Sequence, residues 1–425
     1  MTSRRLSILH LSQLPASPPR FGAQARIHGL LAPLAARHEV TAIALMDPEF
    51  DEDECRRAMA QYCREVVLIP NPHGRGVWAK RALQLRSLVS THSFEHLRYA
   101  VPAFQAELDR LQQRTRFDVV DLEFPYLAHF RMRQSPAGAP RPKVVIDAHE
   151  IAHDMVRQFA RAGLGRGQAL YGELDWRKLR REELAAFRAA DGIYLCSADD
   201  ETRVHAELPG ARTAVVPNAA DVEFYRPRPA DPPADGRTIV FFGLLSTRPN
   251  IDGVTWLVEE IWPRVARARP EARLRIFGKN PPPAVLALVR PGVEVVGFVE
   301  DLRPHLASAA AVAVPLRLGG GTRLKIVEAM AMAKAIVSTR LGAEGIEARP
   351  EREILLADDP AAFAASLVRL LEDPAAAVRL GGAARHLAVE RYAWSSSAAT
   401  LEQFLLETVD GTQRPAAPAP VERTG

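Results

Sequence analysis

The segment 315–339, PLRLGGGTRLKIVEAMAMAKAIVST, carries residue types that suit a diphosphate. Its three glycines, Gly319, Gly320 and Gly321, free the backbone for conformations that a Cβ forbids and let a ligand approach the main chain closely. A helical pattern starts at Leu324, and a helix N-terminus offers unpaired N–H groups and a partial positive charge to an anion. The loop therefore predicts an anion site; the alternative is a permissive strand-to-helix turn that binds nothing.

Polar side chains extend this candidate site. Thr322 lies at the helix start, and Arg323 and Lys325 add positive charge for phosphate oxygens. Glu328, one turn into the helix, could accept hydrogen bonds from sugar hydroxyls. Together these residues predict a nucleotide with a diphosphate, whereas Glu328 by itself would be an ordinary helical residue.

Two other strand ends in the C-terminal half supply candidates. Arg248 lies on the loop after the strand that Gly243 ends, and its planar guanidinium suits bidentate phosphate contacts, although a solvated surface arginine fits the same pattern. Phe298, in GFVEDL, could lie against the face of a base. Alternatively, Glu300 or Asp301 caps a helix there.

The N-terminal half offers residues for the opposite side of the site. Gly22 precedes a helical pattern and Arg26 lies one turn further on, so both could face the sugar or its phosphate, unless the segment is a simple helix start. His149 follows an apolar run that ends near Asp147, and residues just past a parallel strand are common in binding sites. The imidazole of His149 could hydrogen-bond a sugar hydroxyl or carry a proton.

The string HEIAH, residues 149–153, also matches the HExxH pattern of zinc hydrolases. It follows a strand instead of lying inside a long helix, and no third ligand candidate accompanies it. We therefore predict no metal site and keep a zinc hydrolase as a rival function.

These residues need strands and helices to position them, and apolar runs alternate with helical patterns along most of the chain. Such alternation indicates parallel sheets that are covered on both faces. The predicted strands form two series, 6–11, 39–46, 66–70, 119–122, 143–148, 192–197 and 213–217, then 238–243, 273–278, 293–297, 310–316, 335–339 and 353–356. The predicted helices include 23–38, 173–190, 253–268 and 360–371.

The proline-rich segment 225–237, YRPRPADPPADGR, cannot be a core strand and predicts an interdomain linker. A chain of 425 residues is long enough for two domains. We predict two doubly wound, Rossmann-like α/β domains, residues 1–224 and 238–394, with the ligand in the crevice between them. The tail 411–425 is rich in proline and alanine and is expected to be disordered.

Composition narrows the function further. A net charge of +4, without zinc-ligand spacing or a dense basic helix, argues against nucleic acid and fits a small anionic ligand or an anionic surface. Three cysteines without a CxxC favour a reducing compartment. The N-terminal apolar stretch is very short and lacks a small-residue cleavage site, and no segment approaches the length of a membrane span, so we expect a cytoplasmic protein.

One basic segment, residues 73–89, predicts an amphipathic helix. Val77, Trp78, Ala82 and Leu85 could share one face, with basic residues around it: Arg75, Lys80, Arg81 and Arg86. Such a helix can lie on an anionic membrane, or it can pack on its domain as a solvated basic helix. In the first case the protein would contact the inner face of the membrane peripherally and could use a lipid-linked saccharide as acceptor.

The chain resembles the GT-B retaining glycosyltransferases of family 4, the "glycosyl transferases group 1" type, over nearly its whole length. The matching stretches of the second half are FFGLLSTRPNIDGVTWL, RIFGKN, VVGFVEDL, PLRLGGGTRLKIVEAMAMAKAIVST and RLGAEGIE. Those of the first half are PPRFGAQARIHGLLAPLAARHEVTAIAL, DAHE and VVPNAADVEFYRP. The ending ERYAWSSSAATLEQFLLE is similar to the family's last helix, which implies that residues 395–410 return to the first domain.

The resemblance implies a GT-B fold, in which two Rossmann-like domains with parallel sheets face each other across a cleft. It also implies a hexosyltransferase-like enzyme of polysaccharide biosynthesis, with a nucleotide sugar as donor substrate and without cofactor or metal. The acceptor would be a saccharide or a lipid-linked saccharide, and transfer would retain the anomeric configuration. Gly22 and His149 would approach the donor sugar from the first domain.

The resemblance also assigns roles in the second domain. Glu328 would hold the ribose hydroxyls, and Phe298 would frame the base. The diphosphate would bind the loop 319–322 together with Arg248 and Lys325.

The chain departs from the family pattern at several positions. Gly320 stands where the family often has the first of two spaced glutamates. The contact that this glutamate makes with a sugar hydroxyl must therefore come from elsewhere, such as backbone N–H groups. Asn250 stands near a place that is commonly basic, and VVPNAAD has alanine where glycine is usual. Rival functions are a nucleotide-sugar epimerase or phosphorylase on the same scaffold, and an inactive protein that binds a nucleotide sugar.

Overall fold

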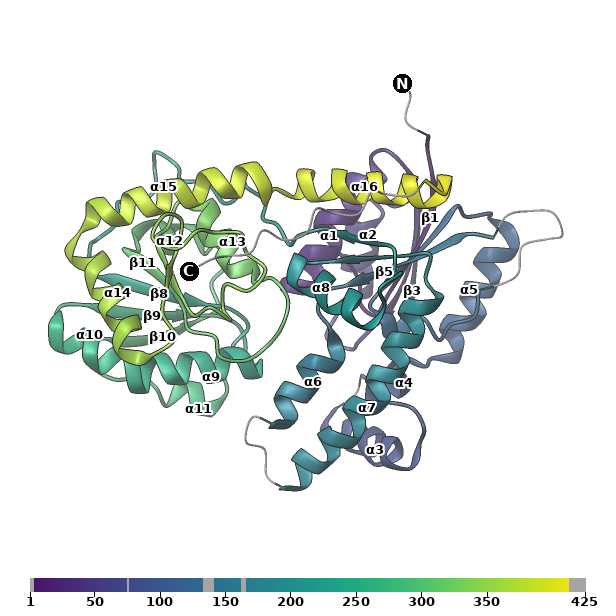
Figure 1. The fold of residues 1–425 in the computed structure, drawn as a ribbon, viewed down its shortest axis with the longest axis horizontal. Helices are drawn as coiled ribbons and strands as arrows, with labels where there is room; N and C mark the ends of the chain where they lie inside the picture. Colours follow the sequence, from purple (N-terminus) through teal and green to yellow (C-terminus); the bar gives the residue numbers. More distant parts are fainter. Residues whose placement is uncertain (1–3, 75, 133–140, 162–165, 413–425) are drawn as a thin grey trace.

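The structure is a computed structural model that describes residues 4–74, 76–132, 141–161 and 166–412. Two parallel sheets dominate it, each with helices packed on both faces (Figure 1). The first sheet has seven strands in the order β3-β2-β1-β4-β5-β6-β7, and the second has six in the order β10-β9-β8-β11-β12-β13. Two doubly wound Rossmann-like domains are therefore confirmed. The predicted tail beyond residue 412 lies outside the described residues, as does Arg75.

The strands fall where continuous apolar runs predicted them. Those of the N-terminal sheet are β1 Ser7–Ser12, β2 Glu39–Met46, β3 Glu65–Pro70, β4 Val119–Glu123, β5 Lys143–Ala148, β6 Gly192–Leu195 and β7 Thr213–Val215. Those of the C-terminal sheet are β8 Thr238–Phe242, β9 Arg273–Phe277, β10 Val293–Gly297, β11 Ala311–Val314, β12 Ile336–Ser338 and β13 Leu355–Leu356.

Each sheet separates two hydrophobic clusters, which explains why its strands are apolar at every position. In β8, Ile239 and Phe241 belong to one cluster, and Val240 and Phe242 belong to the other. In β1, Ile8 belongs to one cluster of the first domain and Leu9 belongs to the other. A strand that is buried on both faces cannot alternate between apolar and polar residues.

Helices of the first domain are α1 Gly22–Ala35, α2 Glu52–Met59, α3 Gly76–Val89, α4 Phe94–Tyr99, α5 Pro102–Arg114, α6 Ala152–Arg161, α7 Arg166–Ala189 and α8 Ala198–Glu207, with a short 3₁₀ turn at Pro125–Leu127. Helices of the second domain are α9 Arg248–Trp256, α10 Trp262–Ala268, α11 Pro283–Leu286, α12 Arg303–Ser308, α13 Leu324–Ala331, α14 Pro360–Glu372, α15 Pro374–Arg391 and α16 Trp394–Asp410.

The predicted helix 253–268 is wrong in two respects. It begins earlier, at Arg248, and a π-helical turn at Leu257–Ile261 interrupts it before α10. Pro263, the second residue of α10, lacks the N–H that an α-helix would donate to the carbonyl four residues back. The π turn occupies the stretch just before this missing bond.

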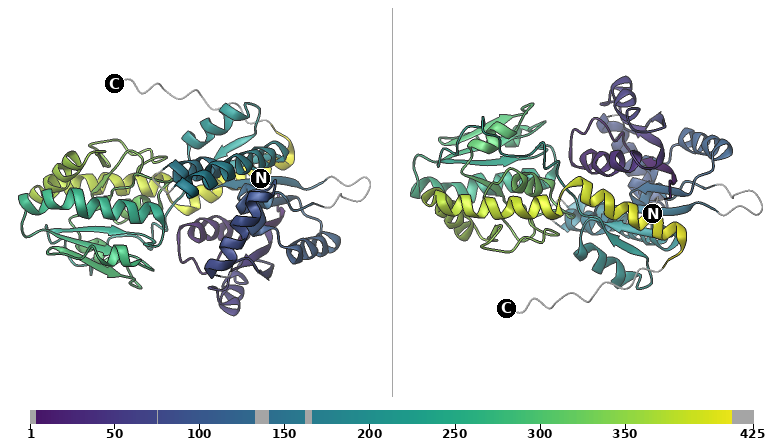
Figure 2. Two further views of the ribbon diagram at one scale, coloured as in Figure 1. Left: turned by 90° about the horizontal axis from the view of Figure 1, so that it is seen from below. Right: turned by 90° about the horizontal axis from the view of Figure 1, so that it is seen from above.

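The last two helices together extend from the second domain to the first (Figure 1). Figure 2 shows α15 and α16 as a yellow band that spans both domains. A Cβ on Gly29 of α1 would lie 2.2 Å from the Trp394 ring, so glycine there allows α1 and α16 to pack closely. A Cβ on Gly192 would lie 2.6 Å from the Phe404 ring. The segment between β7 and β8 that includes the proline-rich stretch 225–237 contains no helix or strand.

In the described part of the chain, no helix is both long and apolar enough to cross a membrane. Cys55, Cys63 and Cys196 are all buried as free thiols. Cys196 follows β6 and is fully buried in the core.

Candidate nucleotide-sugar site

The glycine loop lies between β11 and α13, and it meets the end of β5 from the other domain. Gly319 and Gly321 adopt φ of 109° and 70°, which side chains rarely tolerate. A Cβ on Gly321 would lie 2.6 Å from the His149 carbonyl oxygen. Gly320 is less constrained, because a Cβ there would lie 3.6 Å from the Cβ of Glu150, an ordinary contact. Gly321 is thus required both by its backbone conformation and by the approach of the two domains.

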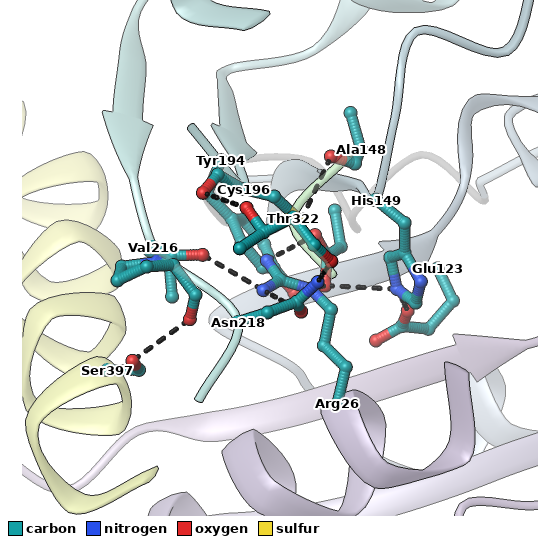
Figure 3. A network of polar contacts seen from close by, with 12 residues as sticks. Arg26, Glu123, Ala148, His149, Tyr194, Cys196, Val216, Asn218, Thr322 and Ser397 are labelled. Atoms are coloured by element: carbon teal, nitrogen blue, oxygen red, sulfur yellow. Dashed lines mark hydrogen bonds and ion pairs between the residues drawn. The ribbon is translucent and has the colours of Figure 1, made fainter. Parts of the chain in front are cut away.

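Thr322 fixes this loop to the N-terminal domain, as Figure 3 shows. Its hydroxyl donates to the Cys196 carbonyl at 3.0 Å, and its own carbonyl accepts from the Asn218 side chain at 2.9 Å. The hydroxyl of Thr322 is therefore used between domains in this structure. The predicted ligand contact of Thr322 remains a prediction, and its observed role is to hold the loop.

Lys325 projects from the first turn of α13 toward the end of β8. Its Nζ donates to Asn250 at 2.6 Å and lies 4.4 Å from the centre of the Phe241 ring. A Cβ on Gly243 would lie 2.9 Å from this Nζ, so glycine at the strand end leaves room for the amine. Burial and, to a smaller extent, the charge of Arg323 lower the pKa of Lys325 to about 7, while the charge of Glu328 opposes this shift. An anion beside this amine would favour its protonated form.

Glu328 lies one turn further along α13, where its carboxylate and the Tyr225 hydroxyl share a hydrogen bond. Burial raises the pKa of Glu328 to about 7, while the bond from Tyr225 and the charge of Lys325 lower it. The interaction with Glu328 and burial raise the pKa of Tyr225 well above its usual value. Sequence reasoning missed Tyr225, because it lies at the start of the proline-rich segment and carries no local signal.

Arg248 and Phe298 follow β8 and β10, the two strands that flank β9 in the second sheet. Arg248 is the first residue of α9, and it donates to the Phe159 carbonyl of α6 at 2.9 Å, across the domain boundary. Phe298 follows β10 and is 57% exposed, with Lys279 Nζ 4.3 Å from its ring centre. The predicted contacts of these two residues with diphosphate and base remain predictions.

His149 is held by carboxylates at the end of β5 (Figure 3). Its Nε2 lies 2.7 Å from Glu123 and 3.3 Å from Asp147, and a tenth of the side chain is exposed. Burial lowers the pKa of His149, but Asp147 and Glu123 outweigh this effect and raise it to about 9. At neutral pH His149 is therefore an imidazolium, which donates hydrogen bonds and cannot act as a base. Glu123 ends β4, so the strand-end rule could have found it.

Arg26 lies beneath His149 rather than beside a ligand. It is 1% exposed, and its guanidinium makes two 2.8 Å bonds to Asp147. The third nitrogen donates to the Val216 carbonyl and to Asn218. The prediction that Arg26 faces the sugar or phosphate therefore needs correction: all three nitrogens are used, and Arg26 supports the carboxylate that holds His149.

Gly22 begins α1, and a Cβ there would lie 3.3 Å from the Leu324 side chain at the start of α13. The two glycine-opened helix starts, one from each domain, are therefore adjacent. This position is compatible with the predicted role of Gly22 at the donor sugar, which nothing here tests.

The HExxH string does not form the helical histidine pair of a zinc hydrolase. Helix α6 begins at Ala152, so His149 lies before the helix and His153 lies within it. The imidazole of His153 pairs with Glu183, whereas His149 pairs with Glu123 and Asp147. The two histidines are thus bound to different carboxylates.

The glycine-rich loop meets the end of β5 at one domain boundary. Around it lie the basic residues Lys325, Arg248 and His149 and the carboxylates of Glu328, Glu123 and Asp147. Two pockets of about 220 and 210 Å³ are lined by residues outside the glycine loop, the first near His38 and Tyr62, the second between α6, α7 and α8. The candidate site is therefore recognised by its chemistry and its convergence from both domains, rather than by the volume of a pocket.

Comparisons with known proteins agree with this architecture. Residues 22–224 match the family model Glycosyltransferase Family 4, and residues 236–373 match Glycosyl transferases group 1. The chain is 24% identical over 417 residues, 91% of its length and 95% of the relative, to a GDP-mannose-dependent alpha-(1-6)-phosphatidylinositol monomannoside mannosyltransferase of Mycolicibacterium smegmatis. It is 32% identical over 199 residues, 44% of its length, to an MMP alpha-(1->4)-mannosyltransferase of Mycolicibacterium hassiacum. This match covers 46% of the length of that mannosyltransferase. Two other curated relatives are matched over 36% and 44% of their length.

Solved structures share the fold at low identity. Sucrose-phosphate synthase from Thermosynechococcus elongatus superposes with a TM-score of 0.74 at 18% identity, covering 96% of this chain and 100% of that one. HepE from Anabaena, solved with UDP and glucose, superposes with a TM-score of 0.65 at 16% identity, covering 94% and 99%. The chain carries a Glycosyltransferase Family 4 domain followed by a Glycosyl transferases group 1 domain, arranged as a GT-B fold.

Proposed function

We propose that this protein is a glycosyltransferase that moves a sugar from a nucleotide-diphosphate sugar to a saccharide or lipid-linked saccharide, with retention and without a metal ion. The observation that carries the proposal is the convergence of the glycine loop, Lys325 and Glu328 from one domain with His149 from the other. The names of the relatives support this class: two are mannosyltransferases, and the HepE structure holds UDP and glucose.

In this proposal the second domain binds the nucleotide. Lys325 and Arg248 would neutralise the diphosphate, and the backbone of the loop 319–321 would donate to its oxygens. Glu328, oriented by Tyr225, would accept hydrogen bonds from the ribose hydroxyls. The exposed ring of Phe298 would frame the base.

Departure of the nucleoside diphosphate leaves negative charge on a phosphate oxygen. Fixed cations and N–H groups that face this oxygen would stabilise the transition state more than the ground state. His149, as an imidazolium, would donate a hydrogen bond to the donor sugar from the first domain. Since this group does not act as a base, we expect the departing phosphate oxygen to help deprotonate the acceptor.

Nucleotide binding provides the direct test. A ligand that binds only the folded protein raises the melting temperature by mass action, so a panel of uridine, guanosine, adenosine and thymidine diphosphates should identify the base. We expect Lys325→Ala and Glu328→Ala each to weaken binding by about 10- to 150-fold, the range for a charge-assisted hydrogen bond. Arg340→Ala and Glu390→Ala, exposed residues of the same domain, serve as matched controls.

Product analysis then separates the related activities. A transferase releases nucleoside diphosphate and glycosylates an acceptor, an epimerase returns an altered nucleotide sugar, and a phosphorylase releases sugar phosphate. If no diphosphate nucleotide raises the melting temperature or binds by calorimetry, the proposed function is refuted.

The acceptor side carries a surface that suits an anionic membrane. On α3, Val77, Trp78, Leu85 and Val89 are 67%, 79%, 67% and 91% exposed. Leu170 of α7 is also exposed, at 64%, and α7 packs against α3 through a 2.9 Å bond between Tyr171 and Ser87.

Exposed apolar side chains among basic residues favour peripheral binding, so we propose that this surface contacts the anionic inner face of the membrane. We expect sedimentation with phosphatidylglycerol vesicles at low salt, weakened by Trp78→Ser and by loss of Arg81 and Arg86, but unchanged by Val378→Ser, which lies on α15. Equal binding to neutral vesicles, or no effect of these substitutions, would contradict the membrane role.

A further inference from the structure

The residue after His149 offers a carboxylate to the glycine loop from the opposite domain. Glu150 is half-buried, and the position that a Cβ on Gly320 would occupy lies 3.6 Å from the Glu150 Cβ and 3.9 Å from its Oε2. Among the residues that the structure describes, no hydrogen bond or ion pair engages this carboxylate. Asp147 and Glu123 nearby are both satisfied, so Glu150 is the acidic group of this strand end without a partner.

Arg323 presents a complementary cation on the same loop. Its Nη1 donates to the Gly321 carbonyl, but its Nε and Nη2 are buried and have no hydrogen-bond partner. Its Nη2 lies 3.2 Å from where a Cβ on Gly319 would be, so the guanidinium lies against the loop. Buried N–H groups without acceptors destabilise a protein, so this arrangement favours a ligand that supplies acceptors.

Arg323 and Glu150 influence each other without forming an ion pair. Burial lowers the pKa of Arg323, and Glu150 is the first of the carboxylates that oppose this shift. Burial raises the pKa of Glu150 to about 7, and Arg323 is the first of the groups that lower it. Each group is thus incompletely compensated, and the glycine loop lies beside both.

We propose that Arg323 and Glu150 together bind the sugar-phosphate part of the donor, Arg323 through a phosphate oxygen and Glu150 through sugar hydroxyls. This inference rests on the proposed function, and it adds a specificity-determining residue from the first domain. A carboxylate accepts hydrogen bonds from two neighbouring hydroxyls, whereas a cation and backbone N–H groups do not distinguish sugars by their hydroxyls. Glu150 therefore provides the sugar contact that a carboxylate on residue 320 would otherwise make.

Calorimetry on the full chain tests the proposal with UDP, GDP, UDP-glucose and GDP-mannose as probes. We expect Glu150→Gln to bind the free diphosphate within twofold of wild type, to lose about 10-fold or more in affinity for the matching nucleotide sugar, and to hydrolyse that donor at least 10-fold more slowly. We expect Arg323→Gln to weaken the free diphosphate and the nucleotide sugar alike.

Glu344→Gln is the matched control for charge. Glu344 is the second carboxylate that acts on Arg323, but its side chain accepts a hydrogen bond from Arg203. If Glu150 acted only through the charge of Arg323, Glu344→Gln would reproduce its effect, and the proposed sugar contact would be refuted.

A double variant guards against a simple folding defect. Position 320 has room for a side chain, so Glu150→Ala combined with Gly320→Glu should return a carboxylate to the same place. We expect this double variant to hydrolyse the donor at least 10-fold faster than Glu150→Ala alone. A Glu150→Gln variant that binds and hydrolyses the nucleotide sugar like wild type overturns this inference alone. If no nucleotide binds to wild type, the proposed function itself is at fault.

Discussion

The charge of His149 should make the stability of the folded protein depend on pH, because the carboxylates of Asp147 and Glu123 stabilise the protonated imidazole. The pKa of His149 rises from its usual 6.5 to about 9 because Asp147 and Glu123 outweigh the effect of burial. At about 1.4 kcal/mol per tenfold change in proton affinity, this difference corresponds to about 3 kcal/mol of stabilisation of the folded protein. A histidine whose folded-state pKa is raised contributes this stability fully below pH 6.5, and it loses the contribution as the pH rises toward 9.

The perturbation is His149→Gln, which keeps a polar side chain but removes the titratable charge. Wild type should exceed the variant in stability by about 3 kcal/mol at pH 6, and the difference should shrink to a few tenths of a kcal/mol by pH 9.5. For a domain of about 200 residues, the difference at pH 6 corresponds to roughly 6–12 °C in melting temperature.

Differential scanning calorimetry of both proteins at several pH values between 6 and 10 measures this effect. His386→Gln, an 84% exposed side chain on α15, controls for the loss of a histidine as such. A difference between wild type and His149→Gln that stays constant over this range would refute the assignment of His149 as a buried imidazolium.

Three further outcomes follow from the site. Burial lowers the pKa of Lys325 to about 7 although Glu328 opposes the shift, so a Glu328→Gln background should lower this pKa further. In that background diphosphate affinity should already fall as the pH rises toward 7, and calorimetry should show that Lys325→Met removes this slope. Gly321→Ala should lower stability by about 1–3 kcal/mol through its positive φ, and by more through contact with the His149 carbonyl, whereas Gly320→Ala should melt close to wild type. Tyr225→Phe should weaken binding of the ribonucleoside diphosphate by about 3- to 10-fold and leave the 2′-deoxy form less affected, as competition calorimetry would show.

The sequence alone was sufficient for the architecture. Strands β1 and β8 are apolar at consecutive positions because both of their faces are buried, and this pattern is local enough to be recognised without coordinates. The glycine loop was equally recognisable as a strand-to-helix turn, because its glycines and the helix that follows are neighbours in the chain. The interruption of 253–268 by a π turn was missed, since a helical apolar pattern does not reveal which hydrogen bonds Pro263 removes.

The tertiary structure decided what the titratable residues do. Arg26 precedes a helical apolar face and looked like a ligand contact, yet folding brings Asp147 within 2.8 Å and buries the pair. The charge of His149, the bond from Thr322 to Cys196 and the contact of Tyr225 with Glu328 all join segments far apart in the chain. A pKa is set by distances and burial in three dimensions, so no local pattern could assign these roles, whereas backbone conformation and apolar periodicity are properties of the segment itself.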